Sequence, residues 1–241
     1  MFGFLRKKSF GLSITDDAVA FAELIRGGNG LQLGRFGEIL LPSGVVQDGK
    51  IRNAQELKRA LAILRARHGI KSAHLSLPDG SGEEVKDYRQ IFKKARIGVR
   101  SAEPRAQAIK RALVGRRDSG TYLVVDFNRG SSAIFIVSGG SLARHAPASS
   151  AIYFLLNEIN KHFISWHTDD PGNPLIEKVI ICGNAENLPE FAKHLSITLK
   201  HPTETADVWA NILNPQEAVP GLHRDQALAF APALGVALKG F

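Results

Sequence analysis

The chain has 241 residues, 44% of them hydrophobic and 22% charged, with a formal net charge of +8. This composition is typical of a soluble globular protein with one large domain or two small ones. No apolar run approaches the roughly 20 residues that a membrane-spanning helix needs. The single cysteine, Cys182, excludes an internal disulfide framework and favours a reducing cytoplasm. The first eight residues lack a signal-peptide pattern, because their short apolar part precedes the charges.

The excess positive charge implies affinity for acidic surfaces. It is spread over residues 6–8, 58–67, 89–100 and 105–117, without interleaved aromatic side chains that could stack on bases. Solvated helix faces are the favoured explanation. An anionic membrane surface or an acidic partner is the second interpretation, and specific nucleic-acid binding is the third.

The first half of the chain opens with three predicted strands, 10–14, 18–25 and 31–40, joined by short polar or glycine-rich turns as in an antiparallel meander. Asn53 and Glu56 have the capping-box spacing that opens a helix, and Gly69 ends it. The remaining elements predicted before the middle of the chain are a returning parallel strand 73–77, a loop 78–83, a helix 83–95, a strand 97–101 and a helix from Pro104 to about Val114.

Residues 115–120 have the glycine-rich, charged composition of a linker. The second half then repeats the plan of the first. It is predicted to contain three strands within 122–145, a helix 150–166, a strand 179–182, a helix 188–195, an irregular segment 203–212 and a final helix 226–238. We therefore expect a first lobe of residues 1–117, completed by the C-terminal helix 226–241, and a second lobe of residues 118–225.

A polar turn follows the first strand of each half. Asp126 ends a buried-looking run and precedes the turn at Asn128 and Arg129, and Asp16 and Asp17 stand in the same place near the N-terminus. Either turn alone is most simply a hairpin whose aspartate bonds its own backbone amides. Their repetition suggests a duplicated fold in which both turns face one cleft. This arrangement resembles the actin-like ATPases, whose two phosphate loops are strand–Asp–Gly–turn–strand units.

Longer stretches make the resemblance closer. In order along almost the whole chain, they are similar to the type IV pilus assembly protein PilM, a relative of the cell-division protein FtsA; the stretches are residues 8–24, 91–97, 101–109, 178–189, 205–212 and 227–240. The resemblance implies an α/β, actin-like (ribonuclease-H-like) two-lobed fold. Compared with the family, the accessory subdomains are largely missing, because only a short loop joins Pro78 to Glu83 and no helical insertion fits between Ser150 and Glu158.

The family's phosphate-loop glycines are replaced in this chain. Thr15 and Asn128 stand where the loops normally have glycine, Ser149-Ser150 replaces one glycine pair, and Gly183-Asn184 replaces another. A Cβ at such a position costs about 1–3 kcal/mol in strain or excludes the ligand. The expected nucleotide cleft is thus degenerate; its candidate cofactor-binding residues are Thr15, Asp16, Asp17, Asp126, Asn128, Arg129, Gly183 and Asn184.

Mg-ATP is the cofactor that the resemblance implies. If it binds, Asp126 is expected to act through the water shell of the metal. No water-positioning catalytic residue is identifiable, so the chain is expected to be a pseudo-ATPase. His162 and His167 lie five residues apart and do not share a helix face as metal ligands would, so no metal site is expected there. Cys182, Trp166 and Trp209 are predicted to be core residues.

The function implied by the resemblance is that of a cytoplasmic scaffold in the type IV pilus assembly platform, peripheral to the inner membrane. Its expected partner is the cytosolic segment of a PilN-like inner-membrane protein, with an anionic membrane surface as a further contact. Two alternatives stay open: an active ATP-binding switch of the same machinery, and a basic nucleic-acid adaptor. A cell-division role like that of FtsA is a weaker variant, since no amphipathic C-terminal anchor is evident.

Overall fold

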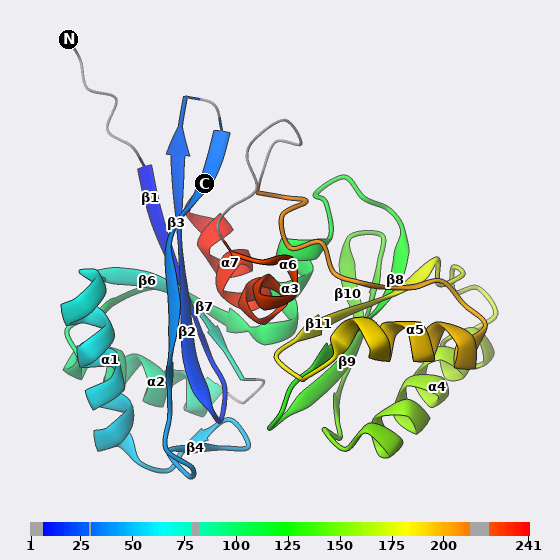
Figure 1. Cartoon of the computed structure of the whole chain (residues 1–241), viewed down its shortest axis with the longest axis horizontal. Coiled ribbons are helices and arrows are strands. Elements are labelled where there is room, and N and C mark those ends of the chain that lie inside the picture. Colours follow the sequence, from blue (N-terminus) through cyan, green and yellow to red (C-terminus); the bar gives the residue numbers. More distant parts are fainter. Residues whose placement is uncertain (1–6, 29, 79–81, 213–221) are drawn as a thin grey trace.

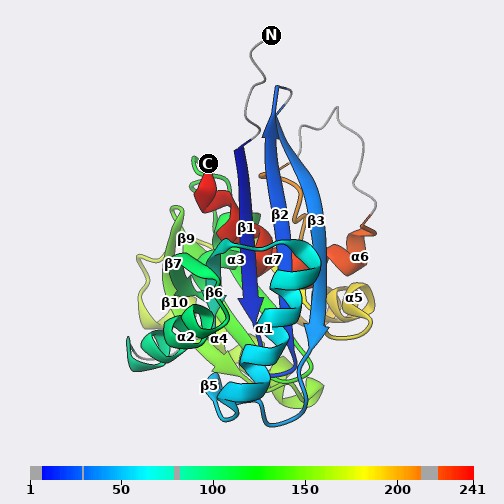
Figure 2. The same cartoon turned by 90° about the vertical axis from the view of Figure 1, so that its left-hand side faces the viewer.

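Two five-stranded sheets dominate the computed structural model, which describes residues 7–28, 30–78, 82–212 and 222–241 (Figures 1 and 2). The first sheet has the order β3-β2-β1-β6-β7, from β1 (Lys7–Ile14), β2 (Ala18–Gly27), β3 (Gly30–Leu40), β6 (Ser72–Leu77) and β7 (Gly98–Pro104). The second has the order β10-β9-β8-β11-β12, from β8 (Thr121–Phe127), β9 (Ser132–Ser138), β10 (Ser141–Ala148), β11 (Lys178–Gly183) and β12 (Thr203–Thr205).

Both sheets have the same topology. β1 is antiparallel to β2 and parallel to β6, and β8 is likewise antiparallel to β9 and parallel to β11. A parallel return requires a crossover, which helices supply; these are α1 (Ala54–His68) and α2 (Gly82–Lys94) in the first half, and α4 (Ile152–Asp169) and α5 (Leu188–Leu199) in the second. The duplicated α/β plan expected from the sequence is confirmed.

Two short features were not predicted. β12 lies in the segment expected to be irregular, where it extends the second sheet beside β11. A small hairpin of β4 (Val46–Gln47) and β5 (Lys50–Ile51) precedes α1. The predicted capping box of α1 is half formed: the Asn53 side chain accepts the Glu56 amide, but the Asn53 amide donates to the Val45 carbonyl.

Two helices from distant parts of the chain form the centre of the molecule. α3 (Arg105–Leu113) and α7 (Ala231–Ala237) pack against each other, α7 lies on β1, β2 and β6, and α3 reaches β9 and β10 (Figure 1). The predicted final helix 226–238 is helical along its whole length, but it is not one regular α-helix. The segment breaks into α6 (Arg224–Ala227), the 3₁₀ turn η1 (Leu228–Phe230), α7 and the 3₁₀ turn η2 (Leu238–Gly240). Pro232, in the first turn of α7, lacks the amide that a continuous helix would need there.

Glycines allow α7 to approach its neighbours closely. A Cβ at Gly11 of β1 would lie 1.9 Å from the Ala233 carbonyl oxygen, and one at Gly235 would lie 1.8 Å from the Ala108 carbonyl oxygen. Both contacts are with backbone, which cannot rotate away as a flexible side chain can. The packing of α7 between β1 and α3 therefore depends on these two glycines.

The hydrophobic core extends across the junction between the sheets. One cluster fills the space between the first sheet and helices α1 and α2. The other is continuous from the opposite face of that sheet, at Ala22 and Leu24, through α3 and α7 to the second sheet and its helices. The division of the chain at residue 117 stays a prediction, as does the assignment of 226–241 to the first lobe.

A buried carboxylate connects α3 and the C-terminal segment to the first sheet. Glu103 of β7 is 9% exposed in its side chain and bonds to Arg111 of α3 and Lys239 of η2. Burial alone would raise the pKa of Glu103, but hydrogen bonds and charge from Arg111 and Lys239 outweigh it and lower the pKa.

Parts of the earlier predictions lie outside the described residues. These are the expectation that residues 1–6 do not belong to a signal peptide, and most of the predicted loop 78–83. Within the described ranges, no helix is long and apolar enough to cross a bilayer.

The first prediction concerns the contact between β1 and α7. Gly11→Ala is expected to lower the free energy of unfolding by about 3 kcal/mol, because the new methyl group has no space without a backbone shift. Urea unfolding measures the change. Gly27→Ala is the matched control, since nothing lies within 4 Å of a Cβ at Gly27. Equal stability of the two variants would contradict the close packing.

The second prediction concerns Glu103. Its folded-state pKa lies below the ordinary value of 4.5, so its stabilisation is present above about pH 4.5 and is lost as the pH falls through the folded-state pKa. Glu103→Gln should therefore cost about 2 kcal/mol at pH 7, and less as the pH falls below 4.5. Glu56→Gln removes an exposed carboxylate with a 3.9 Å contact to Arg59 and should change little. If Glu103→Gln lowers the free energy of unfolding by the same amount at every pH, the lowered pKa of Glu103 is contradicted.

Candidate functional site

The first predicted turn uses its polar side chains for its own structure. The Thr15 hydroxyl donates to an Asp17 carboxylate oxygen at 2.5 Å and accepts the Ala18 amide at 3.1 Å. The Asp16 carboxylate accepts the backbone amides of Asp48, at 3.0 Å, and Gly49, at 3.2 Å. Asp16 thus fixes the β4–β5 turn beside the end of β1.

The second predicted turn is more deeply buried. Asp126 is 1% exposed and Asn128 3%. The Asn128 amide donates to the Ser132 hydroxyl at 3.1 Å, and its side-chain Nδ2 donates to the carbonyls of Asp126, at 3.3 Å, and Ser131, at 3.2 Å. These bonds hold the Asn128 side chain within the turn.

Positive φ is not used at the altered glycine positions. The non-glycine residues with positive φ in the described chain are Asp48, Arg96, Asn187 and Lys200. The backbone is therefore not in the left-handed region at Thr15, Asn128 or Asn184. The backbone strain that a side chain would cause at a glycine position with positive φ does not occur there. What remains is a steric effect, since each of these side chains fills space that a glycine would leave open.

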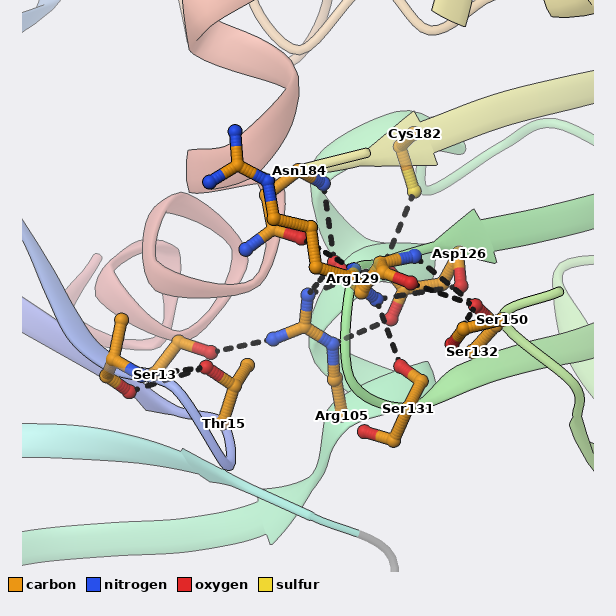
Figure 3. A network of polar contacts seen from close by, with 12 residues as sticks. Ser13, Thr15, Arg105, Asp126, Arg129, Ser131, Ser132, Ser150, Cys182 and Asn184 are labelled. Carbon is orange, nitrogen blue, oxygen red and sulfur yellow. Dashed lines mark hydrogen bonds and ion pairs between the residues drawn. The ribbon is translucent and has the colours of Figure 1, made fainter. Parts of the chain in front are cut away.

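An arginine that the sequence analysis missed joins the two turns. Arg105, the first residue of α3, donates through Nε and Nη2 to the two carboxylate oxygens of Asp126, at 2.5 and 3.2 Å (Figure 3). Its Nη1 donates to the Ser13 hydroxyl of β1 at 2.9 Å, and Nη2 also contacts the Asn128 Oδ1 at 3.3 Å. One buried guanidinium thus binds residues of both sheets at once.

The end of β11 completes the site. Gly183 has φ 120° and lies so close to Phe127 that a Cβ would be 2.0 Å from the Phe127 carbonyl oxygen. Asn184 follows it: its amide donates to the Asn128 Oδ1 at 3.1 Å, and its Oδ1 accepts the Arg129 amide at 3.1 Å (Figure 3). Its Nδ2 donates to Asp17 at 3.3 Å, which is a direct contact between the first turn and the segment after β11.

All eight residues predicted from the sequence therefore lie around one junction. Asp16 approaches the second turn closely enough that a Cβ at Gly130 would be 3.7 Å from its own Cβ. The Arg129 side chain is exposed and pairs with Glu186 at 3.4 Å. A sequence signal for Arg105 existed, because a cation in the first turn of a helix opposes the helix dipole and is unusual without a nearby anion.

Comparison with known proteins identifies the architecture. No family model matches the sequence, and no curated protein matches it either. Among solved structures, the PilM–PilN type IV pilus biogenesis complex aligns with a TM-score of 0.73 and 16% identity, over 96% of this chain and 98% of that one. The ethanolamine utilization protein EutJ from Carboxydothermus hydrogenoformans aligns at 0.70 and 14%, over 96% and 89%. MreB5 of Spiroplasma citri bound to ADP aligns at 0.58 and 12%, over 94% of both.

The chain has the actin-like fold. At identities of 12–16%, these likenesses establish the architecture alone. They agree with the two-lobed α/β prediction and with the structural resemblance to PilM.

The residues of this actin-like junction do not fit Mg-ATP. If Mg-ATP bound, Asp126 would accept hydrogen bonds from the water shell of the metal, but both Asp126 oxygens already accept from Arg105, whose positive charge opposes a metal ion beside it. The Asn128 Oδ1 is shared between Arg105 and the Asn184 amide. A cation supplied by the protein thus neutralises the carboxylate that a metal ion would need. Among the described residues, no group of three or more His, Cys, Asp or Glu side chains could hold a metal.

Cys182 lies beside this ion pair without taking a chemical role. Its sulfur is 3.9 Å from an Asp126 oxygen and fully buried. Burial, and then the Asp126 charge, raise the pKa of the thiol well above its ordinary value. The thiol is therefore uncharged at neutral pH and packs as a core residue, as expected from the sequence.

The sequence also made predictions about two tryptophans and a histidine. Trp166 and Trp209 are both 6% exposed, which confirms their core positions, and the Trp166 Nε1 donates to the Pro174 carbonyl at 2.8 Å. Burial, with Arg144 and Lys161 nearby, lowers the pKa of His162. His162 is thus neutral at pH 7.

The third prediction tests the buried ion pair. Arg105→Gln should lower the free energy of unfolding by about 3–5 kcal/mol, because Asp126 would remain buried without its cation. Arg129→Gln removes the exposed pair with Glu186 and should change stability by about 0.5 kcal/mol or less. Urea unfolding compares them.

A double-mutant cycle completes this test. Asp126→Asn in the Arg105→Gln background should recover part of the lost stability, since no charge then remains buried. Additive losses for the two substitutions would contradict the pairing seen in Figure 3.

Proposed function

We propose that this protein is a cytoplasmic, actin-like scaffold of a type IV pilus assembly platform and that it acts without a nucleotide cycle. In this role it binds the cytosolic segment of a PilN-like inner-membrane protein. The similarity to the structure of the PilM–PilN complex supports the partner. The buried Arg105, bound to Ser13, Asp126 and Asn128, is the observation that carries the nucleotide-independent mechanism.

A nucleotide-driven switch needs a ligand that distinguishes two arrangements of the lobes. In this chain, Arg105 already connects the first sheet to the second, and the Asn184–Asp17 bond connects the first turn to the end of β11 in the second sheet. Mg-ATP would have to displace a tethered, buried cation and separate these bonds before it could bind. A fixed relation of the lobes suits a scaffold, which presents one surface to its partners.

An exposed apolar group supports a protein-binding role. Ile152, Tyr153 and Phe154, at the start of α4, are 53%, 70% and 61% exposed, and the last two rings contact each other edge to face. Consecutive large apolar side chains in solvent often mark a protein contact. We assign the partner segment to this group of three residues.

In this proposal, the protein is held at the inner membrane by its membrane-bound partner rather than by a segment of its own. A net charge of +8 suits a position beside anionic headgroups. The partner would supply the anchor.

The fourth prediction measures the proposed complex. Calorimetric titration with a synthetic cytosolic segment of a PilN-like protein should show saturable binding of equal affinity with and without Mg-ATP. Phe154→Ser should weaken it by about tenfold or more, as loss of an aromatic anchor does. Ile197→Ser, on α5, is the matched control, because Ile197 is 69% exposed but distant in sequence from this group.

Two outcomes would contradict the proposal. If the PilN-like segment does not bind, the pilus assignment is contradicted. A raised melting temperature with Mg-ATP would favour the active-switch alternative, since a ligand at about 100 times its dissociation constant adds about 2.7 kcal/mol.

A further inference from the structure

A second, cationic site lies away from the two turns. A cavity of about 690 Å³ is lined by parts of β2, β3 and α3, the segment after α3, the β9–β10 turn, Asn211 and the C-terminal residues. Its volume is in the range of small-ligand sites, about 300–1,000 Å³. Elements of both halves of the chain therefore surround one hollow.

The charged side chains that line this cavity all have one sign. Four cationic side chains line it, namely Arg26, Lys110, Arg111 and Arg116, and the described residues around it contribute no carboxylate side chain. Such a concentration of like charge is unfavourable without a counter-ion. Low-dielectric walls strengthen its attraction for an anion.

Little of this charge is neutralised within the fold. The ammonium group of Lys110 donates to the Gly140 carbonyl at 2.7 Å, which holds its position but leaves its charge. Arg111 pairs with Glu103, but Lys239 shares the same carboxylate. Arg26 and Arg116 are exposed residues, and Arg26 lies 5.1 Å from the centre of the Phe241 ring. The arginine side chains can bind a multivalent anion bidentately.

The cavity also has an apolar wall. Val114, Leu238 and the Phe241 ring line it together with the cations. The Phe241 ring is itself contacted by Arg26 and Lys7, so the ring helps to hold cationic groups at the rim.

We propose that this cavity binds a small polyanion, a phosphate-bearing or polycarboxylate metabolite, through Arg26, Lys110 and Arg116. The concave shape and volume favour a small molecule over a flat protein or nucleic-acid surface. A ligand here would contact β2, α3 and the β9–β10 turn together, and would stabilise their mutual packing. This site is independent of the partner surface and of the junction at Arg105.

Calorimetric titration tests the proposal in metal-free buffer of low ionic strength. Inorganic pyrophosphate is the phosphate probe, citrate is the carboxylate probe, and an oligoglutamate peptide represents an acidic protein segment. We expect pyrophosphate or citrate to bind saturably at one site. The probe with the higher affinity shows whether the site prefers a phosphate or a carboxylate. Arg116→Gln and Arg26→Gln should each weaken it by about tenfold, the equivalent of one charge-assisted contact.

Arg67→Gln is the matched control, since Arg67 is an exposed arginine near the end of α1. It should leave the affinity unchanged. Binding weakened equally by all three substitutions would show general attraction to a basic protein and overturn the proposal. Binding of the peptide alone, or of none of the probes, would overturn it as well. All three arginines are exposed, so each variant is expected to fold, which its melting temperature checks.

Discussion

The ion pair between Arg105 and Asp126 is the interaction on which the arrangement of the two sheets depends. Each group is buried, so each compensates a charge that would be costly to bury alone. Arg105 begins α3, the helix between the sheets, while Ser13 and Asp126 lie at the ends of the first strands of the two sheets. The pair therefore holds α3, β1 and β8 together at one point. If these elements moved apart, a buried charge would lose its partner.

The same central region is otherwise apolar and tightly packed. α7 approaches β1 and α3 so closely that glycine is required at Gly11 and Gly235. Glu103 adds a second buried charge, compensated by Arg111 and Lys239, at the other end of α3. The helix is thus held at both ends by ion pairs and along its side by backbone contact. Such a junction would oppose hinge motion, which is what the proposed scaffold role requires.

Much of the fold was accessible from the sequence, because strand and helix periodicities repeat in the two halves. The failures are local: β12 has only three residues, and Pro232 interrupts a segment with helical composition. The positions of the two turns were also predictable. The partners of Arg105 were not, because they lie 21 residues away at Asp126 and 92 residues away at Ser13. A cation in the first turn of a helix signals that an anion is near, but no local pattern says which one. The altered glycines indicated a changed site but not what fills it.

The position of α7 has a consequence for synthesis on the ribosome. β1 is made first, but the helix that covers it comes more than 200 positions later, from Ala231 to Ala237. Until then, one face of the first sheet has no permanent cover, and α3 lacks its neighbour. Closing so long a loop is slow, and exposed apolar surface favours aggregation meanwhile. Nascent chains of this protein are therefore expected to need chaperone protection until α7 has emerged.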